Sequence, residues 1–320
     1  MRLRLVPEVT NIDFFKFAPV TFGASCVAMV LSLVAWAFFG LNFGIDFQGG
    51  TTIRSESTQA VDVGAYRAAI QPLNLGDVNI TQIFDPTFGP DRNVASIRIQ
   101  AQDGEQSVTP ETIGAVEEAL KAVDPSITFP SVESVGPKVS GELIQTAFIA
   151  VGASLLAILF YIWLRFEWQF SVGAVAALFH DVILTIGIFS VLQIRFDLAT
   201  IAAILTIIGY SINDTVVIFD RLRENLIKYR KRDLREVMNL SVNETLSRTL
   251  MTSGTTLIAL IALLILGGDV IRGFVFAITW GIIVGTYSSV YVAKNIVLFI
   301  GLDREEKPTD KGNQFANIDA

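Results

Sequence analysis

The segment GYSINDTVVIFD, residues 209–220, carries an asparagine and an aspartate inside a run that is otherwise apolar enough to cross a membrane. Asp214 lies well within that run, whereas Asp220 lies at its end. A charged side chain at the centre of a bilayer costs about 2.5–3.5 kcal/mol on insertion scales. We therefore expect Asp214 to face other helices or a water-filled cavity and to mark a functional site.

Further apolar runs of similar length lie on both sides of this segment. The chain has 320 residues, of which 52% are apolar, and its mean hydropathy of +0.53 is too high for an ordinary soluble domain. A helix of about 20 residues crosses the ~30 Å hydrocarbon layer. The predicted spans are residues 18–40, 143–164, 169–192, 197–219, 249–267 and 273–300. We interpret the first span as an uncleaved helix, although its AWA at 35–37 resembles a signal-peptide cleavage site.

The fold class that follows is a membrane protein, an α-helical bundle of six transmembrane helices with one inserted α+β domain. The predicted parts are an N-terminal segment at 1–17, the first helix at 18–40, the inserted domain at 41–141, helices two to six at 142–301 and a disordered polar tail at 302–320.

Basic residues orient this bundle. The connection between the fourth and fifth spans is basic, and so are both ends of the chain, so the positive-inside rule places all three in the cytoplasm. The inserted domain, in which acidic residues outnumber basic ones, then lies outside the cytoplasm. The basic residues that support this orientation are Arg2, Arg4, Lys16, Arg221, Arg223, Lys228, Arg230, Lys231, Arg232, Arg235, Lys294, Arg304, Lys307 and Lys311.

The inserted domain has the predicted element order β-α-β-β-α-β, which is the ferredoxin-like split unit. Helical patterns occupy 60–71 and 110–123, and Pro130 weakens the last of the strands. This order names no function by itself, because many unrelated activities share it. The predicted strands are residues 51–56, 78–84, 93–100 and 126–135, with a hairpin loop, DPTFGPDR, at 85–92.

Two glycine-containing connectors, FGIDFQGG at 43–50 and VGPKVSGE at 135–142, join the inserted domain to the bundle. They are either plain linkers or hinges that let the domain move against the membrane. The candidate hinge residues are Asp46, Gly49, Gly50, Gly136 and Pro137.

Helical spacing groups the polar residues of the fourth and fifth spans. Arg248 is the natural cationic partner for Asp214, because pairing would offset much of the burial cost. The pair either fixes only the register of two helices or acts as a proton relay driven by the membrane potential. The expected stripes are Thr200, Ala203, Ile207, Tyr210, Asp214, Val217 and Arg221 in one span, and Thr245, Arg248, Thr252 and Thr255 in the other. The polar residues expected to support the pair are Tyr210, Asn213, Thr215 and Thr252.

The third and sixth spans carry faces of small residues. Asp181 lies on such a face and is a weaker candidate for the relay, whereas the neighbouring His180 is expected to pack or hydrogen-bond. In the sixth span, Gly281 and Gly285 belong to a seam that allows close helix packing, against a helix of this chain or of another subunit. The two faces are Gly173, Ala177, Asp181 and Thr185, and Ala277, Gly281, Gly285, Ser289 and Ala293.

Few residues could support catalysis. His180 is the single histidine and Cys26 the single cysteine, so we expect no His/Cys metal site. The sequence has no nucleophile–base set of the kind that hydrolases use. We predict no enzymatic activity, no catalytic residues, no bound metal and no cofactor.

Several motifs, in order along the chain, resemble those of the SecD/SecF family of protein-export membrane subunits, and specifically its smaller SecF branch within the RND superfamily. The resemblance runs from about residue 12 to 300 and is most specific in the fourth span. The motifs are FGIDFQGGT, GPKVSGELI, ALFHDVILT, AAILTIIGYSINDTVVIFDRLREN and LSRTLMTSGTTL.

The resemblance implies a subunit that pairs with a SecD-like membrane subunit and assists the Sec translocon channel. It implies that protons moving down the proton motive force drive the late export of a translocating preprotein, with no nucleic-acid partner. In the family, the intramembrane Asp of NDT and the Arg of SRTLMTS are proton-linked, and these are Asp214 and Arg248 here.

Three other functions remain as alternatives. A small-molecule RND-type exporter half would need a larger external part than about 100 residues to enclose a substrate path. A non-transporting scaffold of the translocon would make the Asp214–Arg248 pair purely structural. An intramembrane enzyme is the most distant alternative, because the residues for catalysis are missing.

Overall fold

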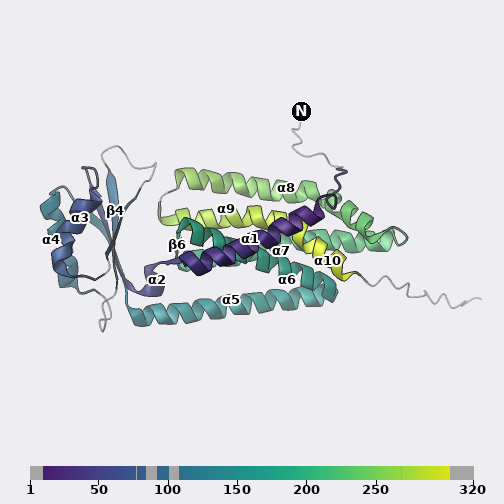
Figure 1. Cartoon of the computed structure of the whole chain (residues 1–320), viewed down its shortest axis with the longest axis horizontal. Coiled ribbons are helices and arrows are strands. Elements are labelled where there is room, and N and C mark those ends of the chain that lie inside the picture. Colours follow the sequence, from purple (N-terminus) through teal and green to yellow (C-terminus); the bar gives the residue numbers. More distant parts are fainter. Residues whose placement is uncertain (1–9, 77, 84–91, 101–107, 268, 303–320) are drawn as a thin grey trace, which may run out of the picture.

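The computed structural model consists of a helical bundle with a sheet domain at one end (Figure 1). It describes residues 10–76, 78–83, 92–100, 108–267 and 269–302. Almost all of the predicted tail and most of the predicted hairpin loop at 85–92 lie outside these residues. Within the described part, the first helix starts and the last helix ends at the same end of the bundle, opposite the sheet domain.

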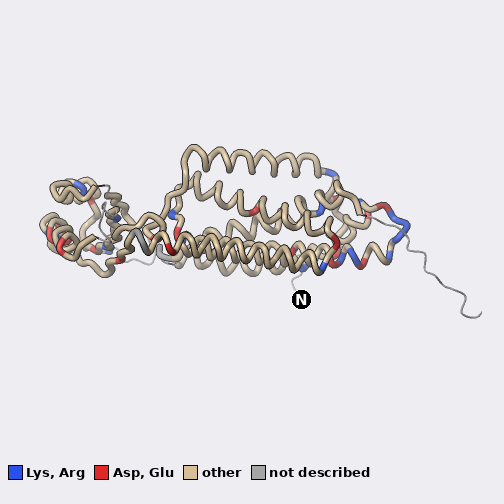
Figure 2. The backbone as a smooth tube through the Cα atoms, turned by 90° about the horizontal axis from the view of Figure 1, so that it is seen from below, with Lys and Arg blue, Asp and Glu red and all other residues tan. Residues whose placement is uncertain are grey.

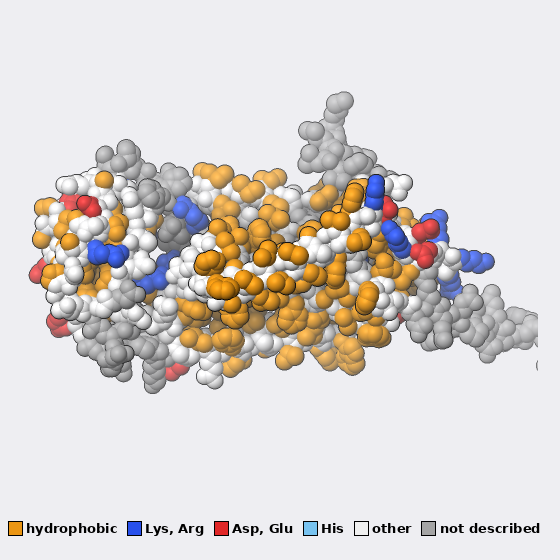
Figure 3. Space-filling view, viewed as in Figure 1, with side chains coloured by type: hydrophobic (Ala, Val, Ile, Leu, Met, Phe, Trp, Pro, Cys, Tyr) orange, Lys and Arg blue, Asp and Glu red, His pale blue; other side chains and the backbone are white. Residues whose placement is uncertain are grey.

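Within the described residues, six helical segments are long and apolar enough to cross a membrane, as predicted. Their outward side chains form an apolar belt between two polar ends (Figure 3). The sixth segment is continuous but includes one π-helical turn. The helices are α1 (Ala18–Phe39), α5 (Pro137–Arg165), α6 (Trp168–Leu192), α7 (Leu198–Lys228), α8 (Leu234–Leu266), α9 (Asp269–Ser288), the π-helical turn η2 (Ser289–Ala293) and α10 (Lys294–Ile300).

Helices α7 and α8 extend beyond the predicted spans and form a charged hairpin at the end away from the sheet domain (Figure 2). This hairpin occupies the predicted connection between the fourth and fifth spans. Polar contacts link the two helices there: Arg221 Nε lies 2.7 Å from Glu244 Oε2, and Asn225 Nδ2 donates to Ser241 Oγ at 3.0 Å. The two helices therefore continue past the apolar spans because their polar faces form hydrogen bonds and ion pairs with each other.

The inserted domain is a four-stranded antiparallel sheet with strand order β3-β4-β2-β5. Helices α3 and α4 cover the face away from the bundle, and Ile53, Ile80 and Ile97 lie in that core. The predicted element order is confirmed; the ferredoxin-like assignment stays a prediction. The elements are β2 (Gly50–Ser57), α3 (Val63–Ile70), the 3-10 helix η1 (Gln71–Leu73), β3 (Val78–Ile83), β4 (Asn93–Ile99), α4 (Pro110–Val123) and β5 (Thr128–Val135).

Pro130 is tolerated because β5 is an edge strand that pairs only with β2. The pairing between these strands is irregular between Arg54 and Glu56, opposite the Thr128–Ser131 stretch that contains Pro130. Pro130, which has no backbone N–H to donate, therefore lies in the irregular part of the β2–β5 pairing.

The connector before the sheet domain is fastened to the bundle by a short parallel pairing. Strand β1 (Asn42–Phe43) pairs with β6 (Arg195–Phe196), which immediately precedes α7. A single helical turn, α2 (Ile45–Gln48), follows and lies against α5, where Ser140 Oγ donates to the Ile45 carbonyl at 3.3 Å. The sequence offered no signal for these two-residue strands.

The glycine seam of the sixth span packs within this chain. A Cβ added at Gly281 would overlap the Ile207 side chain of α7, and one at Gly285 would lie 3.1 Å from Ser211 Cβ. The close approach of α9 to α7 therefore depends on glycine, which answers the question that the sequence left open.

Lys294 does not lie at a membrane interface as a free charge, contrary to the prediction from the positive-inside rule. The residue is fully buried, its Nζ donates to the Phe14 carbonyl at 3.3 Å and it lies 3.5 Å from the centroid of the Phe15 ring. The lysine instead fastens the segment before α1 to the start of α10.

Candidate functional site

Helix α7 positions Asp214 deep inside the bundle. A capping box starts this helix: Thr200 N donates to Asp197 Oδ1 at 2.9 Å, and Asp197 N donates to Thr200 Oγ1 at 3.3 Å. Asp214 is 3% exposed. One of its carboxylate oxygens, Oδ2, has no hydrogen-bond partner in the structure, so the burial of this group is not fully compensated.

The groups that act on the Asp214 carboxyl come from α8. Ser253 and Arg248 both interact with it. The Ser253 hydroxyl also lies 2.7 Å from Thr286 Oγ1 of α9, so it connects the site to the last span. Three helices therefore meet at Asp214.

Arg248 is close enough to act on Asp214, but no ion pair joins these two described residues. Asp214 is buried, whereas Arg248 is exposed on the outward side of α8. The predicted pairing of Asp214 with Arg248 is thus not formed as a direct contact. Along the predicted α8 stripe, only Thr245 is buried, and Arg248, Thr252 and Thr255 face outward.

The supporting residues divide between the inside and the outside of the bundle. Thr215 is buried, and Tyr210 is half-buried with its hydroxyl 3.3 Å from Thr256 Oγ1. Asn213 is exposed, as is Thr252, whose hydroxyl donates to the Arg248 carbonyl at 3.1 Å.

The buried face of α7 is rotated from the predicted stripe. Of the residues predicted to face inward, four are buried: Thr200, Ala203, Ile207 and Asp214. The other three, Tyr210, Val217 and Arg221, are only half-buried. The residues buried in their place include Ser211, Ile218 and Leu222.

A second buried carboxyl, Asp181 of α6, has a full set of donors. Its Oδ2 accepts hydrogen bonds from Ser211 Oγ at 2.6 Å and from Ser288 Oγ at 2.8 Å. Its Oδ1 lies 2.9 Å from His180 Nδ1. The predicted face is confirmed, since Gly173, Ala177, Asp181 and Thr185 are all buried.

His180 belongs to the same cluster, which spacing alone did not indicate. Its ring stacks on Tyr287 of α9, and its Nε2 has no hydrogen-bond partner in the structure. The Tyr287 hydroxyl donates to the Thr21 carbonyl at 2.8 Å, which extends the cluster to α1.

Ser211 connects the two carboxyls along α7. It bonds Asp181 directly and lies three residues, or nearly one turn, before Asp214. Sequence reasoning missed Ser211 and Ser288, although the spacing of Ser211 from Asp214 was a usable signal. Ser288 gave no comparable signal, because only the folded bundle brings α9 beside α6.

The candidate hinge residues lie where the connectors meet the sheet domain. Gly49 and Gly50 have positive φ angles of 71° and 123°, a backbone region that favours glycine. Asp46 Oδ2 accepts a hydrogen bond from Leu198 N at 3.1 Å, so the connector holds the start of α7. On the other side, Gly136 caps α5 and Pro137 opens it.

Among the residues that the structure describes, no group of three or more His, Cys, Asp or Glu side chains could hold a metal ion.

Sequence comparisons relate most of the chain to membrane proteins of protein export. Residues 115–303 match a family described as "Protein export membrane protein SecD/SecF, C-terminal", and residues 34–61 match "SecD/SecF GG Motif". The chain is 70% identical to the protein translocase subunit SecF of Cereibacter sphaeroides, over 100% of this chain and 99% of that protein. It is 62% identical to the protein translocase subunit SecF of Rhodobacter capsulatus, over 98% and 96% of the two chains.

Solved structures extend the likeness to the fold. A crystal structure of SecDF, a translocon-associated membrane protein from Thermus thermophilus, matches with a TM-score of 0.83 at 35% identity over 94% of this chain. SecDF in a super-membrane-facing form matches with a TM-score of 0.68 at 37% identity over 93% of this chain. The present chain spans only 40% and 39% of those two SecDF chains.

Proposed function

This chain belongs to the SecD/SecF family of protein export membrane proteins, and on that basis we propose that it is a SecF-type subunit that couples the proton motive force to late steps of preprotein export. Its partners are a SecD-like subunit, the Sec translocon channel and the translocating preprotein. Its role is transport, with no chemical reaction catalysed.

The observation that carries the proposal is the incompletely compensated carboxyl of Asp214, deep in the bundle and near an arginine that it does not contact directly. Such a carboxyl has two accessible states. When protonated it needs no cation, and when ionised it needs Arg248 to approach. Movement of Arg248 would then accompany each proton that binds or leaves.

The membrane potential is large enough to drive this exchange. One elementary charge gains about 2.3 kcal/mol for every 100 mV that it crosses. Asp181, joined to α7 through Ser211, is a second and weaker candidate station for the proton.

The sheet domain is the moving part in this proposal. The connector is fixed to the bundle up to α2, and Gly49–Gly50 follows immediately. Both SecDF structures match nearly the same share of this chain, yet their TM-scores differ, which supports a fold whose parts can change their relative placement. The mechanical path from Asp214 runs along α7 to Leu198 and from there to Asp46.

The exposed polar residues of α8 support the proposal that a SecD-like partner subunit covers this helix. Arg248, Thr252 and Thr255 face outward from a helix of membrane-spanning length, where contact with lipid is costly for an arginine. A second set of helices covering this face would shield Arg248 and complete the site. The larger size of the matched SecDF chains supports such an addition.

The proposed location is a bacterial inner membrane, with both termini cytoplasmic and the sheet domain periplasmic. The basic α7–α8 hairpin and α10 lie at the end of the bundle away from the sheet domain, which the positive-inside rule assigns to the cytoplasm (Figures 1 and 2). A cysteine at exposed Glu118, in a Cys26→Ala background, should react with an impermeant thiol reagent from the periplasmic side. Labelling only after the inner membrane is broken would contradict this orientation.

The deciding experiment replaces Asp214 with Asn in the assembled complex and measures preprotein export with and without a proton gradient. The gradient-dependent part of export should disappear. Asp220→Asn is the matched control, because Asp220 lies on the same helix but pairs with Arg165, the last residue of α5. If Asp214→Asn folds, assembles and retains gradient-dependent export, the residue is structural and the protein acts as a scaffold.

A further inference from the structure

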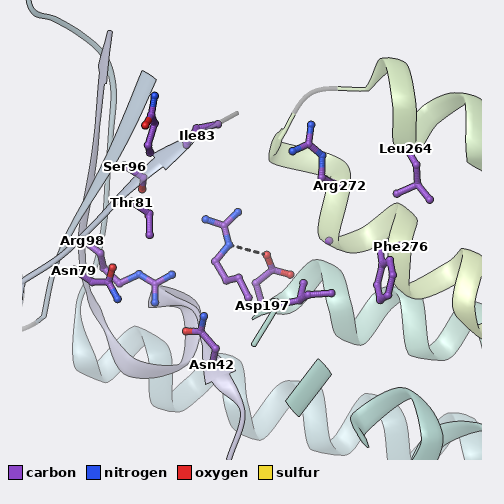
Figure 4. A pocket seen from close by; sticks show the side chains of 14 residues that line it. Asn42, Asn79, Thr81, Ile83, Ser96, Arg98, Asp197, Leu264, Arg272 and Phe276 are labelled. Carbon is purple, nitrogen blue, oxygen red and sulfur yellow. Dashed lines mark ion pairs between the residues drawn. The ribbon is translucent and has the colours of Figure 1, made fainter. Parts of the chain in front are cut away.

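A cavity of about 520 Å³ lies between the sheet domain and the bundle, where no part of the proposed proton path runs (Figure 4). One wall is the sheet face opposite the domain core, with Asn79 of β3 and Ser96 of β4. The other wall comes from β6 and the ends of α8 and α9. The cavity is thus bounded by both of the parts that the hinge would move.

Three arginines from separate segments line this cavity. They are Arg98 of β4, Arg195 of β6 and Arg272 in the first turn of α9. Asp197 is the single acidic residue among the described lining residues, and its Oδ2 lies 3.5 Å from Arg195 Nε. The described lining therefore carries a net positive charge.

Arg98 is held in the cavity by the connector. Its Nη1 donates to the Phe43 carbonyl at 3.0 Å. Burial, and then the nearby Arg195, lower the pKa of the Arg98 guanidinium from its usual range. Two cations that face each other across an interface favour a bound anion.

The position of the cavity, level with the ends of three candidate membrane spans, points to the kind of anion. Arg195 follows the end of α6 at Leu192, Arg272 opens the last span, and Leu264 lies near the end of α8. All three mark the membrane surface on the side of the sheet domain, which is the level of lipid headgroups. Leu264 and Phe276 add an apolar wall beside the arginines.

From this arrangement we propose that the cavity binds a phosphate group, carried by an anionic phospholipid headgroup or free in solution, between Arg98 on the domain and Arg195 and Arg272 on the bundle. Arginine forks suit phosphate oxygens geometrically and in charge. The apolar wall gives a headgroup an advantage over free phosphate, because an acyl chain can lie against Leu264 and Phe276. A phosphate in this place bridges the domain to the membrane.

The test measures binding to the purified complex in detergent, so it does not depend on export. Phosphatidylglycerol, phosphatidylcholine and inorganic phosphate are titrated separately, with bound lipid counted by native mass spectrometry and stability followed by thermal unfolding. Phosphatidylglycerol should bind most tightly, and Arg98→Gln with Arg272→Gln should weaken it about tenfold or more. Arg67→Gln, on α3 away from the bundle, is the matched control and should leave binding unchanged.

The three ligands separate the sources of the phosphate. If inorganic phosphate alone stabilises the wild type and loses affinity in the double variant, the site takes a free anion. If no ligand distinguishes the double variant from the Arg67 control, the proposal is wrong. An acidic peptide that binds in an arginine-dependent way while all phosphates fail would also overturn it and would mark a polypeptide surface.

A single variant outside the sheet domain controls for misfolding of that domain in the double variant. Arg272→Gln alters a side chain on the bundle side of the cavity and should by itself weaken phosphatidylglycerol binding several-fold, on the order of threefold or more. Unchanged binding in this variant contradicts the bridging arrangement.

Discussion

Asp181 and Asp214 are both buried carboxyls of the bundle, but their hydrogen bonding differs. Asp181 receives two hydroxyl donors on one oxygen and contacts His180 with the other. Asp214 has an oxygen without a partner. A fully bonded carboxyl is better suited to hold helices in place, and an incompletely bonded one is better suited to change its state. At the scale of residues, this difference supports the proposal that Asp214 is the principal proton site.

The hydroxyl donors of Asp181 should therefore contribute to stability. Ser288→Ala removes one of two donors from a buried oxygen and should lower the free energy of unfolding by about 1–2 kcal/mol. Equilibrium unfolding in mixed micelles measures the loss. Thr206→Ala is the control, because that exposed hydroxyl bonds only the Ala202 carbonyl of its own helix. Equal effects in the two variants would show that the Asp181 cluster has no special role in stability.

At the scale of elements, the contact between α7 and α9 depends on the absence of a side chain at Gly281. Gly281→Ala should destabilise the bundle by about 1–3 kcal/mol, because its Cβ would overlap the Ile207 side chain. In an Ile207→Ala background, the Gly281→Ala change should cost less than it does in the wild type, because the overlapping side chain is shorter. The same unfolding measurement applies to the single and double variants.

Gly209→Ala on α7 is the control for this contact, since nothing lies within 4 Å of a Cβ added there. It should cause no loss, because alanine favours a helix over glycine. If Gly281→Ala is tolerated as well as Gly209→Ala, the helices can separate at little cost and the seam is not a packing constraint.

The junction between α4 and β5 should make the sheet domain sensitive to acid. Asp124 follows α4 and accepts hydrogen bonds from the Ser57 hydroxyl and from Ser126 N, the latter at 2.8 Å. The Ser57 bond, aided by Ser126 and opposed by burial, lowers the pKa of Asp124. Because the folded pKa lies below the unfolded one, this stabilisation is present above the unfolded value and is lost as pH falls through the folded pKa.

Asp124→Asn tests this linkage. The variant should lose about 1 kcal/mol of domain stability at neutral pH, and its stability should fall less steeply than that of the wild type below about pH 4. Thermal unfolding followed by circular dichroism across that range gives the comparison, with exposed Glu118→Gln as control. Parallel pH curves for the wild type and Asp124→Asn would contradict the assignment.

The same elements explain why sequence reasoning succeeded in some places and failed in others. Long apolar runs and period-two strands are local signals, so the six spans and the domain order were predictable. The rotation of α7 was not, because the position of α9 that buries Ser211 depends on a distant Gly285. The β1–β6 pairing joins segments 153 residues apart by register (Asn42 with Arg195) and has no local pattern.

The candidate site was predictable to a similar extent. A costly aspartate in an apolar helix identified Asp214 and Asp181, and the resemblance supplied Arg248. What the sequence could not supply was that Arg248 faces outward while Asp214 faces inward. That outcome depends on the rotation of two packed helices, and it is the feature that makes a partner subunit necessary in the proposed function.

At the scale of the whole molecule, the decisive property is whether the sheet domain moves on the bundle. Ser96 on the sheet and Gly273 on α9 line the same cavity from its two sides. Cysteines at both positions, in a Cys26→Ala background, can be joined by a short bis-maleimide in the assembled complex. Linking them should stop gradient-dependent export, because the domain can no longer turn about Gly49–Gly50.

A mono-maleimide on the same cysteines adds bulk without a link and should leave most of the export intact. Export that continues at the uncrosslinked rate after complete linking would mean that the connectors are plain linkers and that the force on the preprotein arises elsewhere.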